Sequence, residues 1–128
     1  MDLESLRQYC LSLPHVTEKV QWGSNLLFCV GGKMFSTIEL EPGHPHRFAF
    51  KCGDERFAEL LEREGVTPAP YLARAKWVAL AGFNTLPPAE LRQYVREGYE
   101  IVLARLPKKQ REELGRAPAR RARRRSPR

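Results

Sequence analysis

The chain has 128 residues, of which 42% are hydrophobic and 29% are charged, a composition typical of one globular domain. Its formal net charge of +7 is unevenly distributed, because Arg116 to Arg128 hold seven of the 22 basic residues and no acidic one. The other 15 basic residues balance the 15 acidic ones, so segment 1–115 is formally neutral. We therefore expect one domain over 1–115 and a disordered Arg-rich tail over 116–128.

The composition argues against a membrane protein and against a fold held by disulfides. No apolar run approaches the ~20 residues that a helix needs to cross a bilayer. The segment from Met1 to Glu4 lacks the basic-then-apolar pattern of a secretory signal. The cysteines Cys10, Cys29 and Cys52 are odd in number and widely spaced, which favours small buried side chains over disulfides. We therefore predict a cytoplasmic protein without a membrane partner.

The first half of the chain predicts a helix and then a meander of antiparallel strands. Apolar residues recur at helical spacing through 2–13, with Asp2 placed to cap the first turn and Pro14 to end the helix. Gly31-Gly32 supplies the positive φ angles of a tight hairpin turn. Short runs rich in β-branched and aromatic residues predict strands at 19–22, 26–30, 34–40 and 47–52.

The second half predicts two further helices with a strand between them. Asp54 is placed to cap a helix that ends before Gly65, and the Pro-rich segment 67–70 should be irregular. The apolar run 76–80 predicts a strand, and the longest helix should run from Pro87-Pro88 to just before Pro107. This order predicts an α+β fold of two layers, in which helices cover an antiparallel β-sheet.

The sequence contains no motif of a known catalytic or cofactor site. It lacks a G-x-S-x-G, a Gly-rich phosphate loop ending in Lys-Ser/Thr, an H-E-x-x-H and a C-x-x-C. His44, His46 and Cys52 are the best metal candidates, but their spacing matches no standard site, and we favour an exposed turn. Cys10 could act with His15 as a nucleophile, but its place on the apolar helix face favours a buried, inert thiol. We therefore predict a protein that is not an enzyme and has no metal or cofactor.

Basic residues are the remaining candidates for a binding site. Arg74 and Lys76 precede Trp77, a combination that contacts nucleic acid through phosphates and stacking. We expect Trp77 itself in the core, since tryptophan in a central strand is usually buried. The other basic candidates stand at expected turns or element ends, where a solubility or helix-dipole role explains them equally well. They are Lys33, Lys51, Lys108, Lys109 and Arg111.

Several short motifs follow one another along 1–115. They are Leu13-Pro14-His15-Val16-Thr17-Glu18, Trp22-Gly23, Val30-Gly31-Gly32-Lys33-Met34-Phe35, Phe50-Lys51-Cys52, Pro70-Tyr71, Lys76-Trp77 and Leu106-Pro107-Lys108-Lys109. In order and spacing they resemble the MmcQ/YjbR family, small bacterial proteins that are usually described as DNA-binding.

The resemblance implies a CyaY-like fold, also grouped with secretion-chaperone-like folds, and DNA contact through wings made of strand hairpins. Gly31-Gly32-Lys33 would then be a wing tip, and Lys51, Lys76 and Lys108-Lys109 would match further basic positions of the family pattern. The segment Ala73-Arg74-Ala75-Lys76-Trp77 departs from the family, which often has Asn or His with Lys before the Trp.

We therefore expect this chain to bind duplex DNA mainly through phosphates, with little sequence preference. The alternative is a protein-interaction or small-ligand-binding module whose folded domain has no nucleic-acid role, because a neutral body has no long-range attraction to DNA. That alternative predicts an exposed apolar patch or a concave pocket in place of a basic face. The candidate DNA contacts are Lys33, Lys51, Arg74, Lys76, Lys108 and Lys109 in the domain and Arg120, Arg121, Arg123, Arg124 and Arg125 in the tail.

Overall fold

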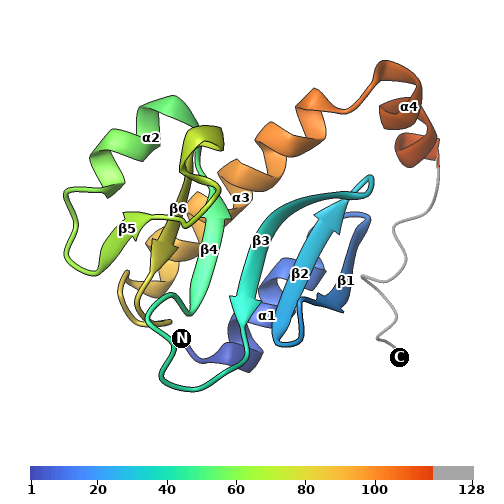
Figure 1. Cartoon of the computed structure of the whole chain (residues 1–128). Helices are drawn as coiled ribbons and strands as arrows, with labels where there is room; N and C mark the ends of the chain where they lie inside the picture. The colour runs from blue at the N-terminus through green and yellow to red at the C-terminus, as the bar shows by residue number, and fades with distance from the viewer. Residues whose placement is uncertain (117–128) are drawn as a thin grey trace.

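In the computed structural model, which describes residues 1–116, helices cover one face of an antiparallel sheet (Figure 1). The predicted α+β class is therefore confirmed, whereas the predicted disorder of the tail falls almost wholly on 117–128, outside the described residues. The elements are α1 (Leu3–Ser12), β1 (Val16–Gln21), β2 (Asn25–Val30), β3 (Lys33–Glu39), β4 (Phe48–Lys51), α2 (Gly53–Leu60), β5 (Val66–Pro68), the 3₁₀ helix η1 (Ala73–Ala75), β6 (Trp77–Leu80), α3 (Pro88–Arg105) and α4 (Lys108–Arg116).

The strands within 1–116 form one sheet in the order β1-β2-β3-β4-β6-β5, and each neighbouring pair is antiparallel. The predicted hairpin joins β2 to β3, with φ of 60° at Gly31 and 80° at Gly32. Because β4 runs antiparallel to both β3 and β6, and Lys51 pairs with Trp77, the β2–β3 turn, the end of β4 and the start of β6 share one end of the sheet. We call it the hairpin end.

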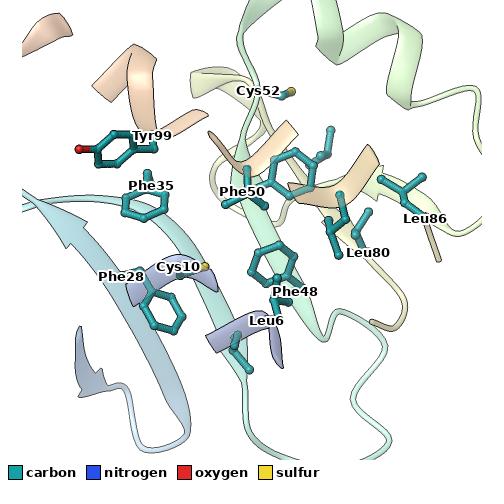
Figure 2. Packing of buried hydrophobic residues seen from close by; sticks show 14 of the residues in the cluster. Leu6, Cys10, Phe28, Phe35, Phe48, Phe50, Cys52, Leu80, Leu86 and Tyr99 are labelled. Carbon is teal, nitrogen blue, oxygen red and sulfur yellow. The ribbon is translucent and has the colours of Figure 1, made fainter. Parts of the chain in front are cut away.

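The main core lies between the sheet and helices α1 and α3 (Figure 2). Alternate residues of the strands point into it, and Phe28, Phe35 and Phe50 are fully buried there. Phe35 meets Tyr99 of α3 edge to face, with 5.4 Å between the ring centroids. Each buried Phe contributes roughly 1.5–3 kcal/mol, so this layer of aromatic rings fixes α3 against the sheet.

Helix α3 approaches the end of β4 at a glycine. A Cβ atom added at Gly98 would lie only 2.1 Å from the carbonyl oxygen of Lys51, so no larger residue fits between the two backbones. The crossing therefore fixes the path of the last turns of α3 over the hairpin end. It places Val102 and Arg105 in the lining of the same pocket as Lys51.

A smaller apolar cluster covers part of the opposite face of the sheet. Val78 and Leu80 belong to the main core, whereas their neighbours Trp77 and Ala79 belong to this second cluster, as alternation along β6 requires. The Trp77 side chain is 3% exposed, so its predicted burial is confirmed. Trp77 is therefore not available to stack on a nucleic-acid base.

Strand β1 starts earlier than predicted, at Val16, and Trp22 lies in the turn that follows it. Trp22 has a φ of 55° and a side chain 66% exposed, so it is neither in the strand nor in the core. The sequence pattern missed the start of β1 because the side chains of this edge strand are half-buried or exposed along its whole length.

Two local predictions in the middle of the chain are wrong. Cys52, not Asp54, is the N-cap of α2, and Asp54 lies in the first turn, where the helix dipole favours an acidic side chain. Pro68 is not irregular but ends β5 at the edge of the sheet, where a missing amide N–H costs no ladder hydrogen bond. Helix α4 is an element that the sequence did not predict, since Leu114 is its single large apolar residue.

None of the helices within 1–116 combines the length and apolar composition that crossing a membrane requires.

Candidate functional site

Basic residues from three elements meet at the hairpin end of the sheet. Lys33 begins β3, Lys51 ends β4 and Arg105 ends α3, and all three line one pocket of about 250 Å³. Its other lining residues are Met34, Val102, Leu106 and Pro107, so no acidic side chain of residues 1–116 lines it. We call it the basic pocket.

Lys51 is the buried member of this group, with 8% of its surface exposed. Its Nζ atom donates a hydrogen bond to the carbonyl oxygen of Ala75 at 2.5 Å. Within 1–116, Lys33, Lys51 and Arg105 form no ion pair with a carboxylate, whereas Arg7, Arg56, Arg63 and Arg96 all do. Burial, and then the charge of Arg105, lower the pKa of Lys51 from its usual value. The pocket thus holds a desolvated cation that has no ion-pair partner among residues 1–116.

The segment before β6 passes beside Lys51 but keeps its own basic side chains out of the pocket lining. Lys76 has a left-handed φ of 65°, and its carbonyl oxygen accepts a hydrogen bond from the Cys52 amide at 2.9 Å. The Lys76 ammonium lies 4.9 Å from the centre of the Phe57 ring, in a cation–π contact with α2. Arg74 is exposed. The structure therefore brings Lys33 and Lys51 together but leaves Arg74 and Lys76 outside the basic pocket.

The β2–β3 turn is docked against the junction of α3 and α4. A Cβ atom at Gly31 would lie 2.5 Å from a methyl group of Leu106, which shows how closely the turn and the junction pack. The Gln110 side chain of α4 donates a hydrogen bond to the Gly31 carbonyl oxygen at 2.8 Å. Figure 1 shows α4 beside this turn. The hairpin tip is therefore packed on one side, against the junction of α3 and α4.

Docking of the turn brings further lysines to the hairpin end. Lys108 and Lys109 start α4, directly after Pro107 of the pocket lining, and both are exposed, as is Lys33. Lys33, Lys108 and Lys109 thus lie on adjoining elements, although more than 70 residues separate them in the chain. We call these three residues the lysine surface. The tail candidates Arg120, Arg121, Arg123, Arg124 and Arg125 lie outside the described residues.

Arg105 belongs to the basic pocket, but sequence reasoning did not single it out. The available signal was a basic residue in the last turn of a helix, which the helix dipole alone explains. Only the crossing of α3 over β4 reveals that Arg105 and Lys51 line the same pocket.

A larger groove of about 540 Å³ runs between the start of α2 and the second half of α3, and Arg105 also lines it. Its charges are mixed: Asp54, Glu55, Glu97 and Glu100 lie in its lining, and the Arg56 guanidinium binds both oxygens of Glu97, at 2.9 and 3.1 Å. Because four carboxylates line this groove and Arg56 is already paired with one of them, the groove is a weaker candidate for an anion site than the basic pocket.

The cysteines do not have the chemistry of reactive thiols. Burial raises the pKa of Cys10 to about 12 and that of Cys52 to about 11, so both are protonated at neutral pH. The predicted inertness of Cys10 agrees with its full burial on α1. His44 Nδ1 accepts a hydrogen bond from the His46 amide at 3.0 Å. In the described part of the chain, no three His, Cys, Asp or Glu side chains are grouped to hold a metal ion.

The model of the YjbR family matches residues 11–101, a segment that contains Lys33 and Lys51 but ends before Arg105. The chain belongs to the YjbR family. A Deinococcus radiodurans protein with a DUF419 domain, solved by crystallography, is 28% identical; the match covers 89% of this chain and 88% of that one, with a TM-score of 0.79.

A Pseudomonas syringae protein of known crystal structure is 14% identical, with a TM-score of 0.67 over 80% of this chain and 99% of that one. At that identity the likeness concerns the fold alone. Among curated proteins, none matches the chain. The resemblance to the YjbR family noted in the sequence is thus confirmed, together with the α+β fold.

Proposed function

We propose that this protein binds duplex DNA through phosphate contacts, with little sequence preference, using the lysine surface at the hairpin end. The observation that supports this most directly is the docking of Gly31 on Leu106 and Gln110, which joins Lys33 to Lys108 and Lys109. A lysine ammonium is a mobile point charge that contacts a phosphate without reading a base. Three exposed lysines on one surface therefore favour backbone contact over sequence readout.

The start of α4 adds a second reason. Lys108 and Lys109 lie in its first turn, where the helix dipole disfavours a cation by about 0.3–1 kcal/mol. The Arg111 amide makes the first intrahelical hydrogen bond, to Pro107, which leaves the three preceding amides without such an acceptor. A phosphate bound here would accept hydrogen bonds from free amides and lysines together, and so offset the unfavourable placement of the two charges.

The Arg-rich tail supplies the net charge that the domain lacks. Segment 1–115 is formally neutral, so the long-range attraction to DNA would come from the seven Arg of 116–128. If each of them neutralises one phosphate, the tail contributes a slope of about −6 to a plot of log K against log salt. The tail would raise affinity, and the lysine surface would fix the orientation of the domain on the duplex.

The experiment is fluorescence anisotropy with two duplexes of unrelated sequence across a salt series, using the full chain and a chain that ends at Gly115. The full chain should bind both duplexes equally, with a slope steeper than that of the shorter chain by about 6. Equal affinities and slopes for the two chains would refute the role of the tail. No binding by the full chain at low salt would refute the proposed function as a whole.

A further inference from the structure

The basic pocket combines cations with an apolar lining, and contact with a DNA backbone would not use that lining. We propose that it binds a small organic anion, a carboxylate or a phosphate monoester that carries a short apolar group. The charged end would contact Lys51, Arg105 and Lys33, and the apolar end would pack on Met34, Val102 and Leu106. This proposal does not depend on DNA binding.

Access to Lys51 is the first argument. Its side chain is almost fully buried and lines a pocket of about 250 Å³, below the roughly 300–1,000 Å³ of sites for drug-sized ligands. A phosphate in a duplex carries its neighbouring sugars with it on a stiff helix, so it cannot enter a pocket of this size. A free anion of a few carbon atoms can enter it.

The unmatched charge of Lys51 is the second argument. An ammonium has three N–H donors, and the structure of 1–116 gives this one a single acceptor, the Ala75 carbonyl oxygen. Ala75 is exposed, so water could satisfy its carbonyl without Lys51. The lysine is therefore not needed to complete the fold at this point, and a bound anion would supply both the missing acceptor and the missing counter-ion.

The apolar lining is the third argument. Val102 and Leu106 are buried, Met34 is half-buried, and Pro107 completes that side of the pocket. A fully hydrated inorganic ion gains nothing from such a surface, whereas each buried methylene of a ligand gains about 0.8 kcal/mol. The combination of three cations with an apolar wall therefore selects an anion with a short hydrocarbon part.

The test is a titration of the ¹⁵N-labelled full chain, followed by two-dimensional NMR at constant ionic strength. The probes are n-butyl phosphate, butyrate, inorganic phosphate and n-butanol. We expect butyl phosphate or butyrate, depending on which anionic group the pocket prefers, to cause saturable chemical-shift changes at the amides of Met34, Lys51 and Val102. Inorganic phosphate should bind at least 10-fold more weakly than the preferred probe. Butanol should not bind. Equal binding of butyl phosphate and inorganic phosphate, or shifts confined to other regions, would overturn the proposal.

Two variants test the named residues, and a third serves as the control. Lys51→Met and Arg105→Gln should each weaken binding of the preferred probe at least 10-fold, whereas Lys19→Gln, on β1 and outside the pocket lining, should leave it unchanged. Arg105 is exposed, so its variant remains informative even if Lys51→Met disturbs the fold. Unchanged affinity in the folded Arg105→Gln protein would contradict the proposed set of contacts.

DNA binding, measured on the same proteins, separates this proposal from the previous one. Lys51→Met should lose the small anion and keep its affinity for the duplex, while replacing Lys108 and Lys109 should have the opposite effect. If the full chain binds butyl phosphate at the pocket but no DNA, the DNA proposal fails and the pocket proposal stands. If it binds DNA but no small anion, the pocket proposal fails and the DNA proposal stands.

Discussion

Lys51 lies where a fold selected for stability alone would place a hydrophobic residue. Its two neighbours in β4, Ala49 and Phe50, are small or apolar, whereas Lys51 ends the strand as a buried cation. Within 1–116, the one hydrogen-bond acceptor of its ammonium is the Ala75 carbonyl oxygen. A residue that weakens the fold at a pocket is the kind of residue that a binding role retains.

Replacing Lys51 by methionine should raise the free energy of unfolding by on the order of 1 kcal/mol at neutral pH, since it removes an uncompensated buried charge. Chemical denaturation in urea, with wild type and variant compared at each pH, measures this. A lower stability of the variant at pH 7 would show that the charge is compensated in solution.

The same pair of proteins should show a defined pH dependence. Because the pKa of Lys51 is lowered by folding, the unfolded state binds more protons between the folded value and the usual 10.5. The stability of the wild type should therefore rise relative to the variant over that interval, and the difference should shrink as the pH approaches 10.5. The comparison with the variant is needed because folding raises the pKa of the Cys10 and Cys52 thiols from 9.0, and their titration lowers the stability of both proteins above about pH 9.

Gly98 is the residue on which the geometry of the pocket depends. Alanine at this position would put a Cβ atom 2.1 Å from the Lys51 carbonyl oxygen, so either α3 or the end of β4 would have to move. We expect Gly98→Ala to lower the free energy of unfolding by about 3 kcal/mol. Gly115→Ala is the matched control, because a Cβ atom there meets nothing within 4 Å and alanine favours the helix. Similar unfolding midpoints for the two variants would contradict the close crossing.

The β2–β3 hairpin and α4 depend on each other, although each looks local in sequence. Gln110 binds the Gly31 carbonyl oxygen from 79 residues away, and Leu106 packs on the same glycine. Such contacts explain how α4 is stabilised with Leu114 as its one large apolar side chain. Its position in turn determines where Lys108 and Lys109 point.

The two turn glycines provide a direct test of this docking. Both have positive φ, so alanine should cost roughly 1–2 kcal/mol at either position. Gly31→Ala must also displace Leu106, whereas a Cβ atom at Gly32 meets nothing within 4 Å. We expect Gly31→Ala to be the less stable variant and to speed hydrogen exchange of the amides of α4. Equal exchange rates in α4 for both variants would argue against docking.

Elements with a regular pattern or strong turn chemistry could be predicted from the sequence. Asp2 caps α1 as expected, with its carboxylate accepting a hydrogen bond from the Ser5 amide at 2.8 Å, and the Gly31-Gly32 turn forms between its predicted strands. Elements that depend on contacts with distant parts of the chain could not be predicted in this way. Strand β1 is an exposed edge, β5 contains a proline, and α4 is held by the hairpin, so their local sequences carry little signal.

The candidate site likewise contains features that could be predicted from the sequence and features that could not. Lys33 and Lys51 could be named from the sequence because they stand at strand ends that the pattern locates. Their convergence with Arg105 depends on the crossing of α3 over β4, and the exclusion of Arg74 and Lys76 depends on the path of η1. The chemistry of the residues could thus be predicted, whereas their grouping required the fold.

At the scale of the whole molecule, the positive net charge comes from residues 116–128 and not from segment 1–115. The domain is formally neutral and groups Lys33, Lys51, Arg105, Lys108 and Lys109 at the hairpin end, while the net charge of +7 comes from the tail. Ion pairs with carboxylates account for Arg7, Arg56, Arg63 and Arg96, which are four of the nine arginines of segment 1–115. Lys33, Lys51 and Arg105 form no ion pair within 1–116 and in addition line one pocket, so we expect the domain to bind anions there.

The most direct test of that claim compares two double variants of the full chain in DNA binding across a salt series. Lys108→Gln with Lys109→Gln removes two charges at the hairpin end, whereas Lys19→Gln with Arg92→Gln removes two exposed charges elsewhere that lack an ion pair within 1–116. The first variant should bind duplex DNA more weakly and reduce the salt slope by about 2, and the second should match wild type. Equal losses in both would mean that net charge alone, and not the hairpin end, determines binding.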